Sequence, residues 1–255
     1  MNIIVCAKQV IDVSEMKVDP GTKKPILQGV PQKISDIDKN AMEEAIKIKE
    51  KHGGKITVVT VGTSDAKERI KELLAMGADE GVIVTAPNNI DYYMTANLLA
   101  DAVKKMGSYD IILCGEASTD LFSGQIGPRL AGLLNIPQMT YAMSTEAGKD
   151  KICSDRNMGA KVVKTESTYP VLITVTKEIN EPRLPSLMQI LGAANKPINE
   201  WTAESLNSSL KPMVETIELK GVPMDRKNIV FKDEIDDSIN KLVDSLAKEG
   251  VLGGW

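Results

Sequence analysis

The strongest constraint on the fold of this chain is the alternation of short apolar runs with amphipathic segments. Four runs are apolar on both faces and rich in β-branched residues, at positions 2–8, 55–62, 81–85 and 110–115. Such runs are typical of parallel strands that are covered by helices on both sides. Between them, segments 38–51, 64–76 and 92–106 repeat their apolar residues at helical spacing. Strand–helix–strand units of this length predict right-handed βαβ crossovers and a fold of the α/β class.

The pattern changes after Pro137. Segments 138–144 and 151–164 predict an antiparallel excursion, and residues 169–176 return as a buried strand. Beyond Asn180 apolar clusters are few until residues 233–248, which have the apolar spacing of one amphipathic helix. That helix either folds back onto its own domain or packs on another subunit. We predict a Rossmann-like, doubly wound, mainly parallel sheet with a C-terminal extension and helix.

Charge and composition exclude several classes of function. Lys and Arg number 31 and Asp and Glu 35, and a net charge of -4 argues against non-specific binding to nucleic acid or to a membrane surface. The three dispersed cysteines fit a reducing compartment and give neither a disulfide framework nor a zinc site. The one histidine is His52, and no common hydrolase or metalloprotease motif occurs, so we assign no catalytic residue and no metal ligand. No signal peptide and no apolar run near the ~20 residues of a membrane helix is visible, so we expect a cytoplasmic protein without membrane insertion.

The most informative loop follows the apolar run at 110–115. It is rich in small and hydroxyl residues and leads into a predicted helix that tolerates Pro128 in its first turn. Ser123, Gly124, Gln125 and Ile126 would present free backbone N–H groups at the positive end of that helix, which suits a phosphate. The alternative is a plain connection between a strand and a helix.

Two other loops would reach the same edge of the sheet, because open α/β sheets bind ligands beyond the carboxyl ends of their strands. These loops lie at residues 6–10 and 61–64. In the first, Lys8 is either a cation of the site or a solvated lysine at the end of a strand. Ser35 and Asp36 are also candidates for the cap of the first helix. Three loops of this kind would form a pocket for an adenine nucleotide.

Several motifs in a fixed order carry a resemblance to a known family. They lie at residues 5–10 (VCAKQV), 15–20 (EMKVDP), 38–45 (DKNAMEEA), 75–79 (AMGAD), 125–128 (QIGP), 137–138 (PQ), and 163–176 followed by 180–183 (NEPR). Together they resemble the β subunit of electron transfer flavoprotein over nearly the whole chain. The last is the most specific, because it resembles the family's signature strand and the start of its partner-recognition loop.

The resemblance implies a heterodimer with a larger α subunit that carries FAD. In conventional members the β pocket holds AMP as a structural element. In the electron-bifurcating group it holds a second FAD, which takes a hydride from NADH and divides the electron pair between a high- and a low-potential acceptor. Residues 15–20 and 29–31 and Asp38 resemble the bifurcating group more closely. We therefore expect FAD, with AMP as the alternative, and as partners the α subunit, a flavin-dependent dehydrogenase, NADH and a carrier such as ferredoxin.

By position, the resemblance assigns the nucleotide pocket to three groups of residues. They are Cys6, Ala7, Lys8, Ser35 and Asp38 in the first, Val61, Gly62 and Thr63 in the second, and Ala117, Ser118, Thr119, Asp120, Ser123, Gly124, Gln125, Ile126 and Gly127 around the phosphates. It makes Leu187 the anchor that inserts into a partner dehydrogenase. Residues 1–190 would form the α/β nucleotide-binding domain with the recognition loop, and residues 191–255 a C-terminal arm and helix packed on the partner subunit.

The chain departs from the family at three places. Glu116 replaces a usual cation, and the bulky Phe122 stands in a loop that is usually small and acidic. Ser35 stands where Asn is usual. The recognition loop is usually basic, whereas residues 190–195 are nearly neutral, which favours a dedicated partner. Two other functions stay open on the residues alone: a stand-alone ATP-binding α/β domain, and a structural subunit with a vestigial pocket.

Overall fold

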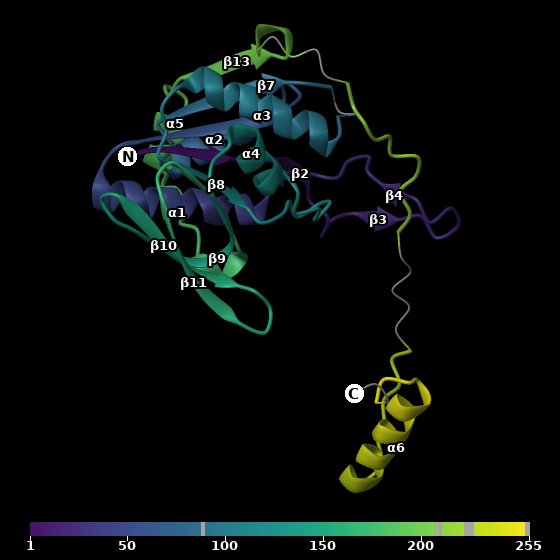
Figure 1. The fold of residues 1–255 in the computed structure, drawn as a ribbon. Coiled ribbons are helices and arrows are strands. Elements are labelled where there is room, and N and C mark those ends of the chain that lie inside the picture. Colours follow the sequence, from purple (N-terminus) through teal and green to yellow (C-terminus); the bar gives the residue numbers. More distant parts are fainter. Residues whose placement is uncertain (88–89, 207, 209–210, 222–226, 253–255) are drawn as a thin grey trace.

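The computed structural model describes residues 1–255 except 88–89, 207, 209–210, 222–226 and 253–255. In the described part, nine strands form one sheet in the order β11-β10-β9-β12-β8-β1-β6-β7-β13 (Figure 1). The parallel strands are β1 (Asn2–Cys6), β6 (Lys55–Gly62), β7 (Glu80–Thr85), β8 (Ile111–Gly115), β12 (Val171–Val175), β13 (Ile198–Thr202) and β9 (Gln138–Ala147). Strands β10 (Lys151–Asn157) and β11 (Val162–Thr168) extend the sheet beyond β9 in antiparallel fashion. The predicted α/β class with a mainly parallel sheet is confirmed.

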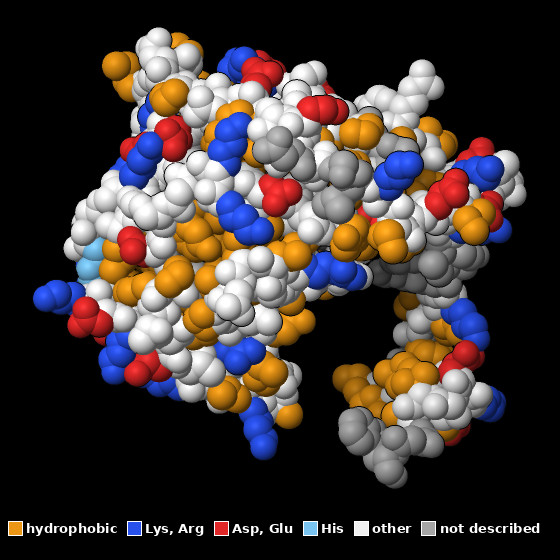
Figure 2. All heavy atoms as spheres, turned by 45° about the horizontal axis from the view of Figure 1, so that its top comes forward, with side chains coloured by type: hydrophobic (Ala, Val, Ile, Leu, Met, Phe, Trp, Pro, Cys, Tyr) orange, Lys and Arg blue, Asp and Glu red, His pale blue; other side chains and the backbone are white. Residues whose placement is uncertain are grey.

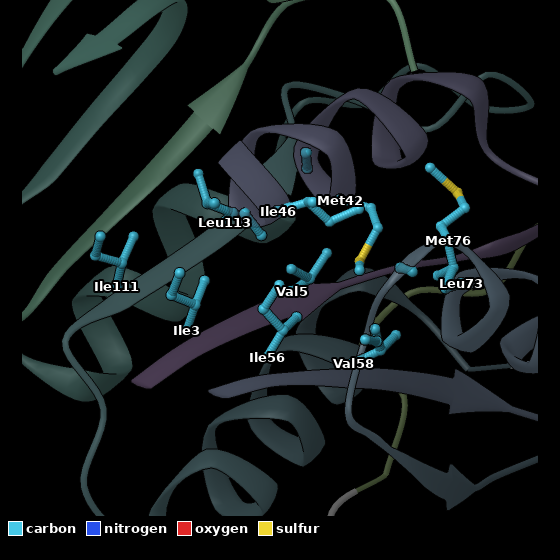
Figure 3. Close-up of a cluster of buried hydrophobic side chains, with 14 of the residues drawn as sticks. Ile3, Val5, Met42, Ile46, Ile56, Val58, Leu73, Met76, Ile111 and Leu113 are labelled. Atoms are coloured by element: carbon cyan, nitrogen blue, oxygen red, sulfur yellow. The ribbon is translucent and has the colours of Figure 1, made fainter. Parts of the chain in front are cut away.

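Helices cover both faces of the parallel strands. They are α1 (Asp36–His52), α2 (Ala66–Met76), α3 (Tyr92–Met106) and α4 (Ile126–Leu134). Successive side chains of a strand point to opposite faces, so Val5 packs with Met42 of α1 (Figure 3), whereas Ile4 belongs to a second cluster with Leu98 of α3. Because aliphatic side chains fill both clusters, the sheet is doubly wound, as the sequence predicted.

The shorter elements lie around this frame. They are β2 (Gln9–Ile11) paired with β5 (Gln32–Ile34), β3 (Lys17–Val18) paired with β4 (Pro25–Ile26), η1 (Lys177–Ile179), α5 (Leu187–Ala193), η2 (Glu204–Leu206) and α6 (Ile235–Lys248). Local chemistry sets the ends of the main helices. The carboxylate of Asp91 accepts the N–H of Met94 at 2.8 Å to begin α3, and Gly107, at φ 93°, ends it.

Segment 151–164, predicted as part of an antiparallel excursion, holds two antiparallel strands. It contains β10 and the start of β11, joined by a tight turn in which Met158 donates its N–H to the carbonyl of Lys161 at 2.9 Å. Gly159 adopts φ +79°, a conformation that favours glycine. The turn carries only this one strong signal, and polar residues are common in both strands. The sequence pattern therefore did not separate them.

Strand β13 was not predicted and lies within the range 191–255 assigned to an arm. It pairs in parallel with β7 at the edge of the main sheet. Trp201 packs on the α3 side, where Nζ of Lys105 lies 4.6 Å from the centroid of its ring, and Ile198 packs against the hydrophobic cluster on the other face of the sheet. A short edge strand with polar neighbours lacks the periodicity of a buried one. Residues 198–202, within the range assigned to the arm, therefore belong to the main sheet.

Helix α6 lies away from the sheet in the structure. None of its residues is buried, and Ile235, Ile239, Leu242 and Val243 on it are all exposed. Figure 1 shows α6 apart from the sheet, and Figure 2 shows hydrophobic side chains gathered on this separate lobe. Of the two expectations for this helix, packing back onto its own domain is not what the structure shows. Among the described helices, none is long and apolar enough to cross a bilayer.

Candidate functional site

The predicted loops meet at the carboxyl edge of the sheet, where its winding direction changes. Strand β1 pairs with β6 on one side and with β8 on the other. The chain runs from β1 to β6 and β7 in one direction and then crosses back to β8. Ligands of open α/β sheets bind at such a switch point.

Asp38, in the first turn of α1, joins the ends of the two central strands. Its buried carboxylate accepts the backbone N–H of Lys8 at 2.8 Å and that of Gly115 at 3.0 Å. A Cβ on residue 115 would lie 2.6 Å from Oδ1 of Asp38, so this approach requires glycine. Burial raises the pKa of Asp38 to about 7, against the opposing effect of the two N–H groups and of the Lys8 cation. Asp38 thus forms the floor of the site.

The side chain of Lys8 is paired within the site. Its Nζ lies 2.6 Å from Oδ2 of Asp120 and 3.5 Å from Oγ of Ser118. Burial alone would raise the pKa of Asp120, but hydrogen bonds from Lys8 and Ser118 hold it below its ordinary value. The pair ties the loop after β1 to the loop after β8, so Lys8 is not the solvated lysine of the alternative expectation.

Ser35 also connects two loops. It is fully buried, donates its N–H to the carbonyl of Lys8 at 3.0 Å, and its Oγ accepts the N–H of Thr119 at 3.4 Å. It stands at the N-cap position of α1 but makes no side-chain capping bond, so its hydroxyl serves the pocket wall instead. The hydroxyl of Thr119 is buried and has no hydrogen-bond partner among the described residues. A buried polar atom of this kind needs a partner, which a bound ligand would supply.

The start of α4 presents a row of free backbone donors. Among the described residues, none accepts the N–H of Ser123, Gly124, Gln125, Ile126 or Gly127. The preceding loop places Gly124 at φ +63°, and alternation of left- and right-handed residues turns successive N–H groups to one side. Together with the helix dipole, this arrangement fits an anion such as a phosphate.

Glycine is also required inside α4. A Cβ on Gly127 would lie 2.4 Å from Cγ2 of Thr174, so the helix start packs directly against β12. Pro128 lies in the first turn of α4, as predicted.

The third predicted loop follows β6, the neighbour of β1. The carbonyl of Gly62 accepts the N–H of Ala86 at 2.9 Å, and the hydroxyl of Thr63 donates to Asp65. Gln9 links this loop to the first, because its Nε2 donates to Oδ2 of Asp65 at 2.9 Å. Oε1 of Gln9 is buried without a partner among the described residues. Gln9 was not among the predicted site residues, although its place directly after Lys8 was the available signal.

The remaining predicted residues differ in what they can offer a ligand. Cys6 is buried in the cluster beneath α3, and burial raises the pKa of its thiol to about 12, so only its backbone can serve the site. Ala7 is buried on the opposite face and donates its N–H to Val59. Ala117 is buried in the loop after β8, and Val61 packs on the α3 side.

Leu187 lies apart from this edge, at the first position of α5, with its side chain 71% exposed. A capping box between Ser186 and Gln189 begins the helix. The guanidinium of Arg183 binds the carboxylates of Glu43 and Glu50 on α1, with shortest distances of 2.9 and 2.6 Å. The segment before Leu187 is therefore anchored to α1 by these ion pairs.

The comparison with known proteins decides the family. The electron transfer flavoprotein domain matches residues 25–206, which include Asp38, the loop after β8 and the start of α4. This chain belongs to the electron transfer flavoprotein family. Its general role is electron transfer, and the match disfavours a stand-alone ATP-binding domain.

Three relatives extend this finding. The chain is 39% identical to the electron transfer flavoprotein subunit beta of Thermoanaerobacterium thermosaccharolyticum, over 99% of this chain and 100% of that protein. It is 41% identical to the subunit of the same name from Clostridium acetobutylicum, over 81% of this chain and 80% of that protein. It is 36% identical to the caffeyl-CoA reductase-Etf complex subunit CarD of Acetobacterium woodii, over 82% of this chain and 81% of that protein.

Proposed function

We propose that this chain is the β subunit of a heterodimeric electron transfer flavoprotein and that its carboxyl-edge pocket holds FAD. The observation that supports this most directly is the row of free N–H groups at residues 123–127, beside the unpartnered hydroxyl of Thr119. The row would bind the pyrophosphate, while backbone groups near Ala7 and Thr63 would hold the adenosine half. The bound flavin would supply the redox chemistry, and the residues of this chain would bind and orient it.

FAD is preferred to AMP in this pocket because residues 15–20 and 29–31 resemble the bifurcating group. The similarity to a subunit named for a caffeyl-CoA reductase-Etf complex agrees with a chain that works with a flavin-dependent dehydrogenase. In this role the bound flavin would supply electron transfer from NADH, with ferredoxin as the low-potential acceptor. A conventional β subunit with structural AMP is the second candidate, since both nucleotides share the adenosine half.

The exposed apolar surface of α6 supports a larger partner subunit. Ile239, Leu242 and Val243 present one apolar stripe with no cover from the described residues of this chain. The α subunit is the partner we propose for this stripe.

The test of this function begins with the nucleotides of the native complex. The complex is purified and denatured, and the released nucleotides are identified by mass and absorbance for each β chain. FAD held by the β chain is the expected result. Release of AMP instead would favour the second candidate, a conventional β subunit. Release of no nucleotide would mean that the pocket does not bind one.

A Gly124→Val variant then tests the location of the site. Valine is strained at φ +63°, and its Cβ would lie 3.6 Å from the carbonyl oxygen of Glu116, so the loop that presents the free N–H groups must change and we expect the variant to lose its nucleotide. Gly132→Val is the matched control, because a Cβ there meets nothing within 4 Å. A Gly124→Val protein that keeps its nucleotide would show that the site lies elsewhere.

A further inference from the structure

Phe122 occupies an unusual place at the tip of the loop between β8 and α4. The chain has only two phenylalanines, and this one is 65% exposed, next to Leu121, which is 51% exposed. Its φ is +48°, in the left-handed region that residues with a side chain rarely adopt. Two apolar side chains in water, one on a strained backbone, point to a contact that this chain does not itself provide.

Hydrogen bonds within the loop after β8 fix the position of Phe122. Its N–H donates to the carbonyl of Ser118 at 3.0 Å, and the N–H of Leu121 donates to Oδ1 of Asp120 at 2.8 Å. Asp120 is in turn held by Lys8. These hydrogen bonds hold the backbone of Phe122 in place, so its ring is exposed on an ordered loop.

The same backbone conformation builds the phosphate site. Phe122 directly precedes Ser123 and Gly124, the first of the free N–H donors, and its left-handed turn helps to direct them to one side. A phosphate bound there lies one or two residues from Phe122. The adenosine side of the pocket is enclosed by buried residues such as Ser35 and Ala7, whereas Phe122 stands on the exposed rim.

We propose that Phe122 is a specificity-determining contact that selects FAD over AMP by packing its ring against the flavin part of the dinucleotide. The inference rests on the proposed nucleotide site. AMP ends at its phosphate, so it offers nothing beyond the N–H groups of α4. FAD continues through the pyrophosphate to a planar isoalloxazine, which is a suitable partner for an exposed aromatic ring.

The test compares the affinities of the two nucleotides. FAD and AMP are titrated by calorimetry into the full chain, stripped of nucleotide, as wild type, Phe122→Ala and Phe122→Tyr. Alanine keeps a Cβ and therefore a similar backbone penalty, but it removes the ring. We expect Phe122→Ala to lose about tenfold in FAD affinity, equivalent to ~1.4 kcal/mol, and less than about twofold in AMP affinity. Phe122→Tyr retains a ring and should match the wild type.

Four results would overturn the proposal. Equal losses for FAD and AMP in Phe122→Ala would mean that the ring only supports the loop. Unchanged affinities for both, with loss of association with the partner subunit, would assign the ring to a protein interface. A wild-type chain that binds neither nucleotide would overturn both this inference and the proposed function. If the wild type binds FAD but Phe122→Ala leaves the ratio of FAD affinity to AMP affinity unchanged, only the inference is overturned.

Discussion

The carboxylate of Asp38 is a buried acid whose hydrogen bonds come from the ends of two strands. Its pKa of about 7 in the folded chain exceeds the ordinary value of 3.8, because burial disfavours the charged form. Its contribution to stability is therefore full below pH 3.8 and is lost as the pH rises through 7. Above that pH, the charged carboxylate costs on the order of 4 kcal/mol of stability relative to an unburied one.

We predict that Asp38→Asn removes this pH dependence. Asparagine is neutral throughout this pH range, but the one oxygen of its amide can accept only one of the two N–H groups directly. The free energy of unfolding of the variant should therefore be about 1–3 kcal/mol lower than that of the wild type at pH 5. This difference in the free energy of unfolding should shrink between pH 5 and 8, because the wild-type carboxylate becomes charged and the wild type loses stability. Urea unfolding at several pH values in this range measures the difference. An unchanged difference from pH 5 to pH 8 would contradict the role assigned to Asp38.

At the scale of elements, the short helix α5 presents an apolar and uncharged surface. The side chains of Leu184, Leu187, Met188 and Leu191 are exposed, and residues 184–195 contain no charged residue. Arg183 holds the segment before this helix to α1. Such a surface suits a neutral apolar groove on a partner, whose binding should depend little on ionic strength.

We predict that Leu187→Ala weakens binding of the partner dehydrogenase by about tenfold or more, the effect of removing an interface anchor. Nucleotide content should stay unchanged, because α5 lies apart from the carboxyl-edge site. Met158→Ala is the control, since Met158 is also an exposed apolar residue but lies at the β10–β11 turn. Equal effects of the two variants on dehydrogenase binding would remove Leu187 from the interface.

The helices and strands differ in how well their sequence patterns predicted them. Helices α1, α2 and α3 and the central strands have strong periodicity because both faces of the sheet are buried, and the sequence located all of them. Strand β13 and the β10–β11 turn were missed because edge strands with polar faces have little periodicity. The predicted loops lie together at one edge of the sheet, but the contacts of Gln9 and Cys6 depend on side-chain directions that spacing alone does not give.

At the scale of the whole molecule, the chain combines a folded α/β body with an arm that carries α6. The arm is tied to the body at a few points: the carboxylate of Asp91 accepts the N–H groups of Met213 and Val214 at 2.6 and 2.9 Å. Gly221 donates its N–H to the carbonyl of Lys23 at 2.8 Å. The arm is therefore directed by the body, and the apolar stripe of α6 is available to a partner.

We predict that a chain ending at Gly221 keeps its fold but loses assembly with the α subunit. Helix α6 buries none of its residues, so its loss should change the midpoint of thermal unfolding by only a few degrees. Size-exclusion chromatography of the two co-expressed chains measures assembly. Within the full chain, Leu242→Asp should weaken assembly and Asn240→Asp, outside the apolar stripe, should not. A truncated chain that still forms the heterodimer would refute this role of α6.

The sequence by itself determined the α/β class, the positions of the main strands and helices and the loops that carry the site. These follow from short-range periodicity and from turn and cap residues, whose effects depend on near neighbours in the chain. Only the tertiary structure decided that Asp38 binds the backbone of both Lys8 and Gly115, that Lys8 pairs with Asp120, and that α6 stays uncovered. The reason is physical: these contacts join residues far apart in sequence, and the order of strands in the sheet decides which of them meet.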